Sequence, residues 1–286
     1  MLKHNLLLII LFIPFYYCNA QSDTTHHKVD RKIIVSAAYG MTKPFGETTI
    51  YQQHIPGITY GNNIGGTAKS GYYYKVDIKF AITDNIGVSF TSYTSQNKTN
   101  PLPPSDFGVV YYYTINMNAQ ASSTTYYSKV WNTSGVFVGL CATKHFKVMD
   151  LNFKLLLGEQ EVASPETEID NVGTTWLTSP SSIMPYSNQT IQPVIVSLNL
   201  AAGLGIDCSF NITKRFKLNI GWDEYMSKAK FVGTQNTTFK YTDSTGVTQT
   251  GNEPGTVSFT KKVNLFCLNA GISYVFDGRW VKKFYK

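Results

Sequence analysis

The feature that most constrains the fold is a strict alternation of apolar with small or polar side chains between Val194 and Lys230. In the first half, the apolar face carries Val194, Val196, Leu198, Leu200, Ala202, Leu204 and Ile206. After a short break at 211–215, the alternation restarts with Phe216, Leu218, Ile220 and Trp222. A period of two places successive side chains on opposite faces, so both halves are predicted to be β-strands.

The two faces of these predicted strands suit different surroundings. Ser197, Asn199 and Asp207 lie on the face opposite to the apolar residues, together with several small side chains. A tilted strand of about 9–11 residues, rising ~3.3 Å per residue, is long enough to cross a bilayer. The pattern therefore favours a sheet with lipid outside and a polar lumen inside. A secreted, soluble β-sandwich, in which the apolar faces would pack together, is the main rival.

Six further segments of the 286-residue chain alternate in the same way. The eight predicted strands cover 32–40, 72–82, 86–93, 133–143, 148–158, 194–210, 216–230 and 260–276. Their connections are alternately long and short, and the long ones are 43–69, 97–130, 159–192 and 232–257. This order predicts an all-β fold, an eight-stranded antiparallel up-and-down transmembrane β-barrel over 31–276. The short turns would be periplasmic and the long loops extracellular.

A resemblance to a known family rests on two short phrases and on this strand pattern. The phrase at 80–88, Phe-Ala-Ile-Thr-Asp-Asn-Ile-Gly-Val, ends one strand and begins the next, and Asn-Ala-Gln stands at 19–21. The chain from residue 21 onward resembles the eight-stranded outer-membrane β-barrels of the OmpA/OmpX-like group, of Bacteroidetes type. The resemblance implies an architecture rather than a role. It also implies a terminal aromatic residue, which Tyr274 or Phe276 supplies ahead of a periplasmic tail at 277–286, and no peptidoglycan-binding domain is expected.

The first twenty residues are typical of a cleaved signal peptide. They combine a basic start, an apolar run at 6–13 and the small residue Ala20 at the cleavage site. A lipoprotein anchored at Cys18 is the rival, weakened by the two bulky tyrosines before that cysteine. We therefore expect export through the signal peptide 1–20, an N-terminal lead-in at 21–30, and a location in the bacterial outer membrane.

Charges of both signs occur on the predicted inner face of the strands. They are Lys75, Asp77, Lys79, Asp150, Lys154, Asp207, Lys217 and Asp223. An eight-stranded barrel is just wide enough to be filled by its own side chains, and an unpaired buried charge is costly. We predict a structural charge network that closes the lumen. The alternative is a narrow pore, or a channel through which small ligands enter, lined by the same residues.

Aromatic residues mark the expected edges of the membrane. The predicted girdle consists of Tyr72, Tyr74, Trp222, Tyr274 and Phe276. Two further tyrosine clusters, at 111–113 and 126–127, lie beyond the expected membrane band. They are predicted to pair across an extended hairpin, and the alternative is that they bind a ligand or partner.

The sequence gives little support for an enzyme. The histidines outside the signal peptide are His26, His27, His54 and His145, all in predicted lead-in, loop or turn positions. They are interpreted as solvated, because none has zinc-ligand spacing or a matching serine. Cys141, Cys208 and Cys267 are interpreted as packing residues. We expect no catalytic residue, no metal and no cofactor.

The net charge of +7 invites a nucleic-acid interpretation. The lysines alternate with apolar residues along strands and do not gather on one helix face, so no nucleic-acid partner is expected. The expected partners are outer-membrane lipid and an extracellular molecule that contacts the loops, and the chain is expected to be a monomer. The predicted role is non-enzymatic: envelope integrity or surface interaction through the outer loops.

Overall fold

The computed structural model describes residues 32–45, 54–55, 58–59, 67–100, 117–177, 183–242 and 245–276. The predicted signal peptide, the lead-in, the tail 277–286 and the tyrosine cluster at 111–113 lie outside these ranges. Every described element is a β-strand. No helix within the described ranges is long and apolar enough to span a membrane.

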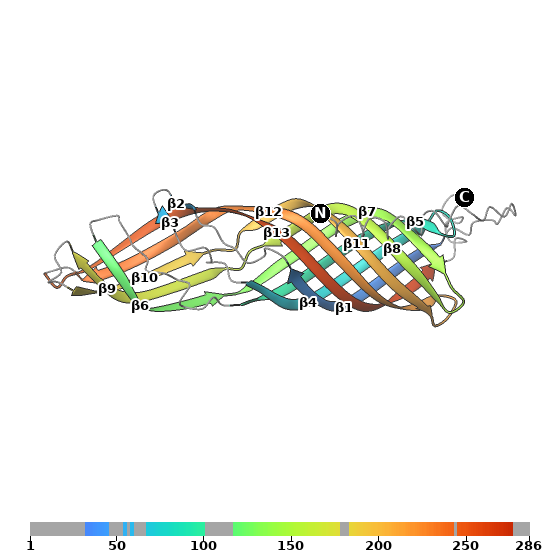
Figure 1. The fold of residues 1–286 in the computed structure, drawn as a ribbon, viewed down its shortest axis with the longest axis horizontal. Helices are drawn as coiled ribbons and strands as arrows, with labels where there is room; N and C mark the ends of the chain where they lie inside the picture. The colour runs from blue at the N-terminus through green and yellow to red at the C-terminus, as the bar shows by residue number, and fades with distance from the viewer. Residues whose placement is uncertain are drawn as a thin grey trace, which may run out of the picture. The chain divides into compact units, whose positions relative to one another are not determined.

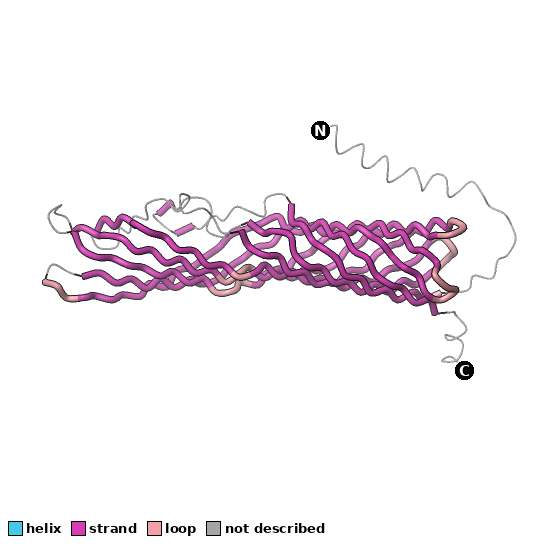
Figure 2. Tube along the Cα trace, turned by 90° about the horizontal axis from the view of Figure 1, so that it is seen from below, coloured by secondary structure: helices cyan, strands magenta, loops and turns pink. Residues whose placement is uncertain are grey.

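Eight strands close into a ring (Figures 1 and 2). They are β1 (Ile33–Phe45), β4 (Thr67–Ala81), β5 (Ile86–Asn100), β7 (Val130–His145), β8 (Met149–Ala163), β11 (Val196–Asn211), β12 (Phe216–Thr242) and β13 (Thr248–Phe276). Each strand pairs antiparallel with the next along the ring, and β13 pairs with β1 to close it. The prediction of an eight-stranded up-and-down barrel is confirmed, and the sandwich alternative is wrong because the eight strands form one closed ring rather than two sheets packed face to face.

The short turns lie at one end of the ring. Two of them share a local device: the hydroxyl oxygens of Thr83 and Thr213 each accept hydrogen bonds from the backbone N–H groups two and three residues later. The first residue of β1 pairs with the last residue of β13, Ile33 with Phe276, at this same end. Threonine at these turns therefore replaces part of the backbone pairing that the reversal interrupts.

Three of the four long connections consist largely of β-strand rather than irregular loop. β12 and β13 run for 27 and 29 residues, far beyond the ring. Three additional strands, β6 (Met117–Ser128), β9 (Thr167–Leu177) and β10 (Ile183–Gln192), continue this sheet in the order β13-β12-β10-β9-β6 (Figure 1). We call these five strands, beyond the ring, the extension sheet. In the remaining connection, β2 (His54–Ile55) and β3 (Ile58–Thr59) form a separate two-stranded sheet.

The sequence in these connections hides the strands because polar residues occupy both faces. Asn236, Thr237 and Thr238 follow one another in β12, so no apolar period of two marks that strand. Backbone pairing still forms the sheet, since Thr190 of β10 and Glu253 of β13 are the ladder partners of Thr237. A strand whose two faces are both polar shows no apolar period of two, so a search for apolar alternation misses it.

Candidate functional site

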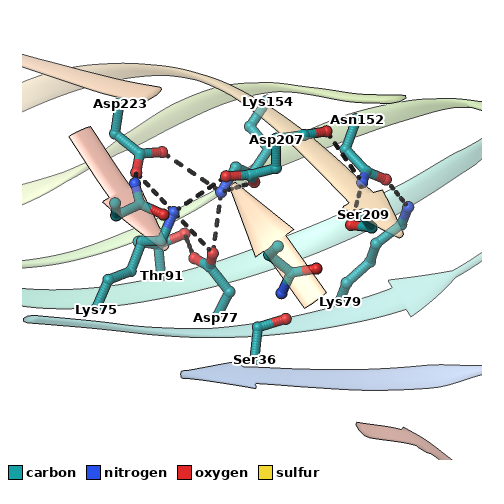
Figure 3. Close-up of polar contacts among 12 residues, drawn as sticks. Ser36, Lys75, Asp77, Lys79, Thr91, Asn152, Lys154, Asp207, Ser209 and Asp223 are labelled. Atoms are coloured by element: carbon teal, nitrogen blue, oxygen red, sulfur yellow. Dashed lines mark hydrogen bonds and ion pairs between the residues drawn. The ribbon is translucent and has the colours of Figure 1, made fainter. Parts of the chain in front are cut away.

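The centre of the ring holds an ion-pair network of two lysines and three aspartates (Figure 3). Lys75 contacts Asp223 at 2.6 Å, Asp77 at 3.3 Å and Asp207 at 3.4 Å. Lys154 contacts the same three carboxylates, with Asp207 at 2.6 Å, Asp77 at 3.0 Å and Asp223 at 3.4 Å. These five residues come from β4, β8, β11 and β12, so one network links four strands of the ring.

Neutral polar groups add hydrogen bonds to this central network. Thr91 donates to Asp77 at 2.5 Å, and Asn269 donates to Asp223 at 2.8 Å. The Tyr73 hydroxyl also donates to Asp223, at 3.1 Å. Lys75 is 3% exposed and Asp223 is 0% exposed, so these bonds replace the water that burial removes. These neutral partners were not predicted from the sequence, although their alternation with charged residues places them on the inner face.

A glycine makes room for one carboxylate of the network. Gly221 lies on the inner face of β12 opposite Asp207 of β11 in the ladder. A methyl group at this position would overlap the Asp207 carboxylate. Gly221 therefore determines where Asp207 can lie inside the ring.

A second polar group lies closer to the short turns. Lys79 donates to Asn152 at 2.9 Å and to Thr143, and Lys217 contacts Asp150. Lys79 therefore bonds to an amide and a hydroxyl, and within the described ranges no ion pair joins it to the central network. The eight predicted lumen charges all point inward, but they form two groups rather than one.

His145 belongs to this second group. Its Nδ1 lies 2.7 Å from an Asp150 oxygen, and its Nε2 lies 2.7 Å from the backbone oxygen of Asp84. His145 is exposed, with 52% of its side chain accessible, as expected of a solvated turn histidine, and both of its ring nitrogens also have protein partners. The contact joins the end of β7 to the turn before β5, an approach that no sequence pattern predicts.

An aromatic layer fills the lumen on the extension side of the central network. Tyr93 stacks on Tyr225 with ring centroids 4.2 Å apart, and Phe137 lies 5.0 Å from Tyr225. Tyr73 lies 5.7 Å from Tyr93 and bonds the Tyr225 hydroxyl at 2.9 Å. All four rings are buried, and Gln160 donates to the Tyr93 hydroxyl at 2.5 Å. This layer was not predicted from the sequence.

A third layer lies still further toward the extension sheet. Trp131 and Phe231 meet edge to face at 5.9 Å, and the Lys261 ammonium lies 4.6 Å from the centre of the Trp131 ring. All three side chains are buried. From the turn end, the lumen therefore contains four levels in order. They are the second polar group around Lys79, the central ion-pair network, the aromatic layer around Tyr93, and the layer of Trp131 with Phe231.

The predicted girdle residues all lie on the outer face of the ring, in separate places. Tyr72 and Tyr74 are exposed beside Tyr39, whose ring is 4.9 Å from that of Tyr74. Tyr274 and Phe276 lie at the turn end, with ring centroids 4.6 Å apart. Trp222 packs against Phe266 at 5.8 Å on the outside of β12 and β13.

The described cysteines form no disulfide, and the described His, Cys, Asp and Glu side chains form no three-residue metal site. Cys141 and Cys267 are buried on inward positions, Cys208 lies on the outward face of β11, and all three thiols are free. Across the ranges that the structure describes, no three His, Cys, Asp or Glu side chains are arranged to hold a metal ion.

No protein-family model and no curated protein sequence matches the chain. Several solved structures have a similar fold. Neisserial surface protein A is 10% identical over 85% of this chain and 97% of its own, with a TM-score of 0.40. The attachment invasion locus protein Ail of Yersinia pestis is 11% identical over 87% of this chain and 100% of its own, with a TM-score of 0.38. The outer membrane protein AlkL is 13% identical over 91% and 96%, with a TM-score of 0.41. Similarity at this level assigns neither a family nor an activity.

Proposed function

We propose that the chain is a non-enzymatic outer-membrane barrel with a sealed lumen, which supports the envelope and presents the extension sheet to partners outside the cell. The observation that carries this proposal is the filling of the lumen. Each charged group of the central network lies within 3.4 Å of an opposite charge, and the rings of Tyr93, Phe137 and Tyr225 pack together in the lumen above it. A lumen closed at successive levels suits a structural and surface role better than transport.

The distribution of side chains supports a membrane setting. Leu155, Leu157 and Ile220 are more than half exposed on the outside of the ring, whereas Lys154 and Asn219 are buried inside it. This arrangement is the reverse of a water-soluble protein, in which a continuous exposed apolar band would be costly. Lipid around the ring removes that cost.

Location and orientation belong to the same proposal. A signal peptide at 1–20 would export the chain, the short turns and the tail 277–286 would be periplasmic, and the extension sheet would be extracellular. The eight-stranded up-and-down order supports membership of the OmpA/OmpX-like group, of Bacteroidetes type. We expect the barrel to be monomeric, with an extracellular partner contacting the extension sheet.

The test is conductance of the purified full-length protein in planar bilayers, after its barrel has been verified by gel mobility in SDS. An unheated closed barrel should migrate faster than the boiled chain. The sealed lumen predicts no steady conductance above that of the bilayer alone. A steady conductance whose ion selectivity changes in Lys75→Gln, but not in the outward-facing Lys98→Gln control, would instead establish the narrow pore or ligand channel.

A further inference from the structure

The inner face of the ring gathers side-chain oxygens around one glycine, Gly221. In the ladder, Asp207 of β11 lies on one side of this glycine and Asn269 of β13 lies on the other. Asn219 is two residues earlier on the same face of β12 and is buried. Each of these three neighbours carries an oxygen, and Gly221 has no side chain to separate them.

The amide oxygen of Asn269 is buried and accepts no hydrogen bond from any described residue. The orientation of this amide is fixed, because its Nδ2 donates to Asp223 at 2.8 Å and a carboxylate can only accept. Its Oδ1 therefore points away from Asp223. Asn269 is only 5% exposed, and a buried acceptor without a donor is costly.

The oxygen that meets Asn269 at Gly221 belongs to a carboxylate. A methyl group on Gly221 would overlap Oδ1 of Asp207 and lie 3.1 Å from Oδ1 of Asn269, so both oxygens border the same point. This Asp207 oxygen has a long contact of 3.4 Å with Lys75, whereas the other lies 2.6 Å from Lys154. Two acceptors therefore meet with no hydrogen between them, and their negative charges repel.

The charge of the central network also favours a further cation. The network contains three carboxylates and two ammonium groups, so it is one positive charge short. Lys79 lies nearer the turn end, and its ammonium bonds there to the neutral groups of Asn152 and Thr143. Buried charge without a close partner is costly, and a cation between Asp207 and Asn269 would remove that cost.

We propose that Oδ1 of Asp207 and Oδ1 of Asn269 bind a monovalent cation of the size of Na⁺. Asn219, whose buried amide oxygen is also without a partner among the described residues, supplies the next ligand along β12. Carboxylate and amide oxygens are the ligands that hard cations take in proteins. The network lacks a single charge, so a monovalent ion fits it better than a divalent one.

The proposed ion is a fixed part of the lumen. Asp207 has the most exposed side chain of the three aspartates, at 13%, so an ion from solution can reach this carboxylate. Two of the three ligands are asparagines, which distinguishes the site from the three-residue clusters of His, Cys, Asp or Glu considered above. The inference goes beyond the proposed function and does not depend on it.

The test uses the purified full-length protein in a non-ionic detergent, with Na⁺ as the probe. Binding is measured from the broadening of the sodium NMR signal. Stability is measured by urea unfolding in NaCl and in choline chloride at the same ionic strength, since choline is too large to lie between packed strands. At a Na⁺ concentration tenfold above its dissociation constant, the unfolding equilibrium constant should be about tenfold lower in NaCl.

Two variants locate the ion. Asp207→Asn removes the excess negative charge, and its new amide nitrogen can donate to Oδ1 of Asn269, so this variant should be equally stable in the two salts. Asn269→Leu removes the opposite ligand and should also lose the Na⁺ effect. Asp84→Asn is the matched control, because Asp84 is exposed in the turn between β4 and β5, and it should keep the full effect.

The outcomes are decided first by the unmodified protein. Equal stability in the two salts, without broadening of the sodium signal, would overturn the cation site and would indicate a water molecule that bridges the two oxygens. Each variant is checked for the faster-migrating unheated band in SDS, and if one variant lacks this band the other decides. A Na⁺ effect that persists in the folded variants would place the ion elsewhere and would overturn the assignment to Asp207 and Asn269.

Discussion

At the scale of single residues, Lys154 is the group on which the central network depends most. Its ammonium contacts Asp77, Asp207 and Asp223, and Lys75 is the other cation within reach of all three. In Lys154→Met, three buried carboxylates would share one lysine. The free energy of unfolding should fall by about 3–5 kcal/mol, the usual cost of leaving buried charge without its partner.

The measurement is urea unfolding in one detergent, followed by tryptophan fluorescence. Lys98→Met on the outer surface is the control, and its effect should stay within about 0.5 kcal/mol. Equal stabilities for the two variants would contradict a structural role for the network.

A pH dependence is expected from Lys261, which lies beyond the apolar belt, next to the outward-facing Lys262. Burial lowers the pKa of Lys261 to about 8, from its ordinary value of 10.5. Between these values the unfolded chain binds more protons than the folded one, so stability should rise as the pH rises from 8 to about 10.5. Lys261→Met removes the titrating group and should therefore remove this rise.

For Lys261, the free energy of unfolding of the variant is subtracted from that of the unmodified protein at each pH. This difference cancels the titration of all other groups. Both free energies are measured by urea unfolding in detergent, followed by tryptophan fluorescence. A difference that does not change between pH 7 and pH 10 would contradict a desolvated ammonium at this position.

The period of two in the sequence assigns a face to each residue but leaves its level and partners open. Lys75 and Tyr73 share the inner face of β4, yet one joins the charged level and the other reaches the aromatic level. Levels depend on how strands shift past one another around the ring, and no single strand contains that information. The stacking of Tyr93 on Tyr225 therefore could not be predicted from either strand alone.

At the scale of elements, the eight ring strands follow from apolar alternation, and the extension sheet does not. The expected loop at 232–257 is a paired hairpin because backbone hydrogen bonding, rather than an apolar face, holds β12 and β13 together there. Pro254 lies in β13 opposite Asn236, where it cannot donate a hydrogen bond. Beyond Asn264 no described strand pairs with the other edge of β13, so this proline removes no ladder bond.

Proline substitutions therefore test the extension sheet. Thr237 lies in β12 between β10 and β13, and Thr237→Pro should break the ladder there and expose this sheet to limited proteolysis. Thr256→Pro is the control, since it has the same orientation as Pro254 on the edge strand. Both variants should keep the faster-migrating unheated band, because the ring is intact. Equal protease resistance of the two variants would indicate that the extension strands are not paired.

At the scale of the whole molecule, closure of the ring depends on the close approach of β1 and β13. Gly40 lies opposite Asn269 in this last pairing, and a methyl group at Gly40 would overlap the backbone oxygen of Leu268. Backbone atoms of a paired strand cannot move aside as the end of a flexible side chain can. Gly40→Val should therefore prevent closure, and an open ring would expose two unpaired strand edges to lipid, where each unpaired backbone group costs several kcal/mol.

The expected result for Gly40→Val is loss of the faster-migrating unheated band, with the chain recovered in aggregates. Gly246→Asn is the matched control, because Gly246 lies in the turn between β12 and β13, and asparagine tolerates its positive φ of 82°. If the Gly40→Val protein still shows the faster-migrating unheated band, β1 and β13 can accommodate valine and the ring stays closed. Loss of the band in Gly40→Val alone would show that one inward-facing glycine decides whether eight strands form a barrel or an open sheet.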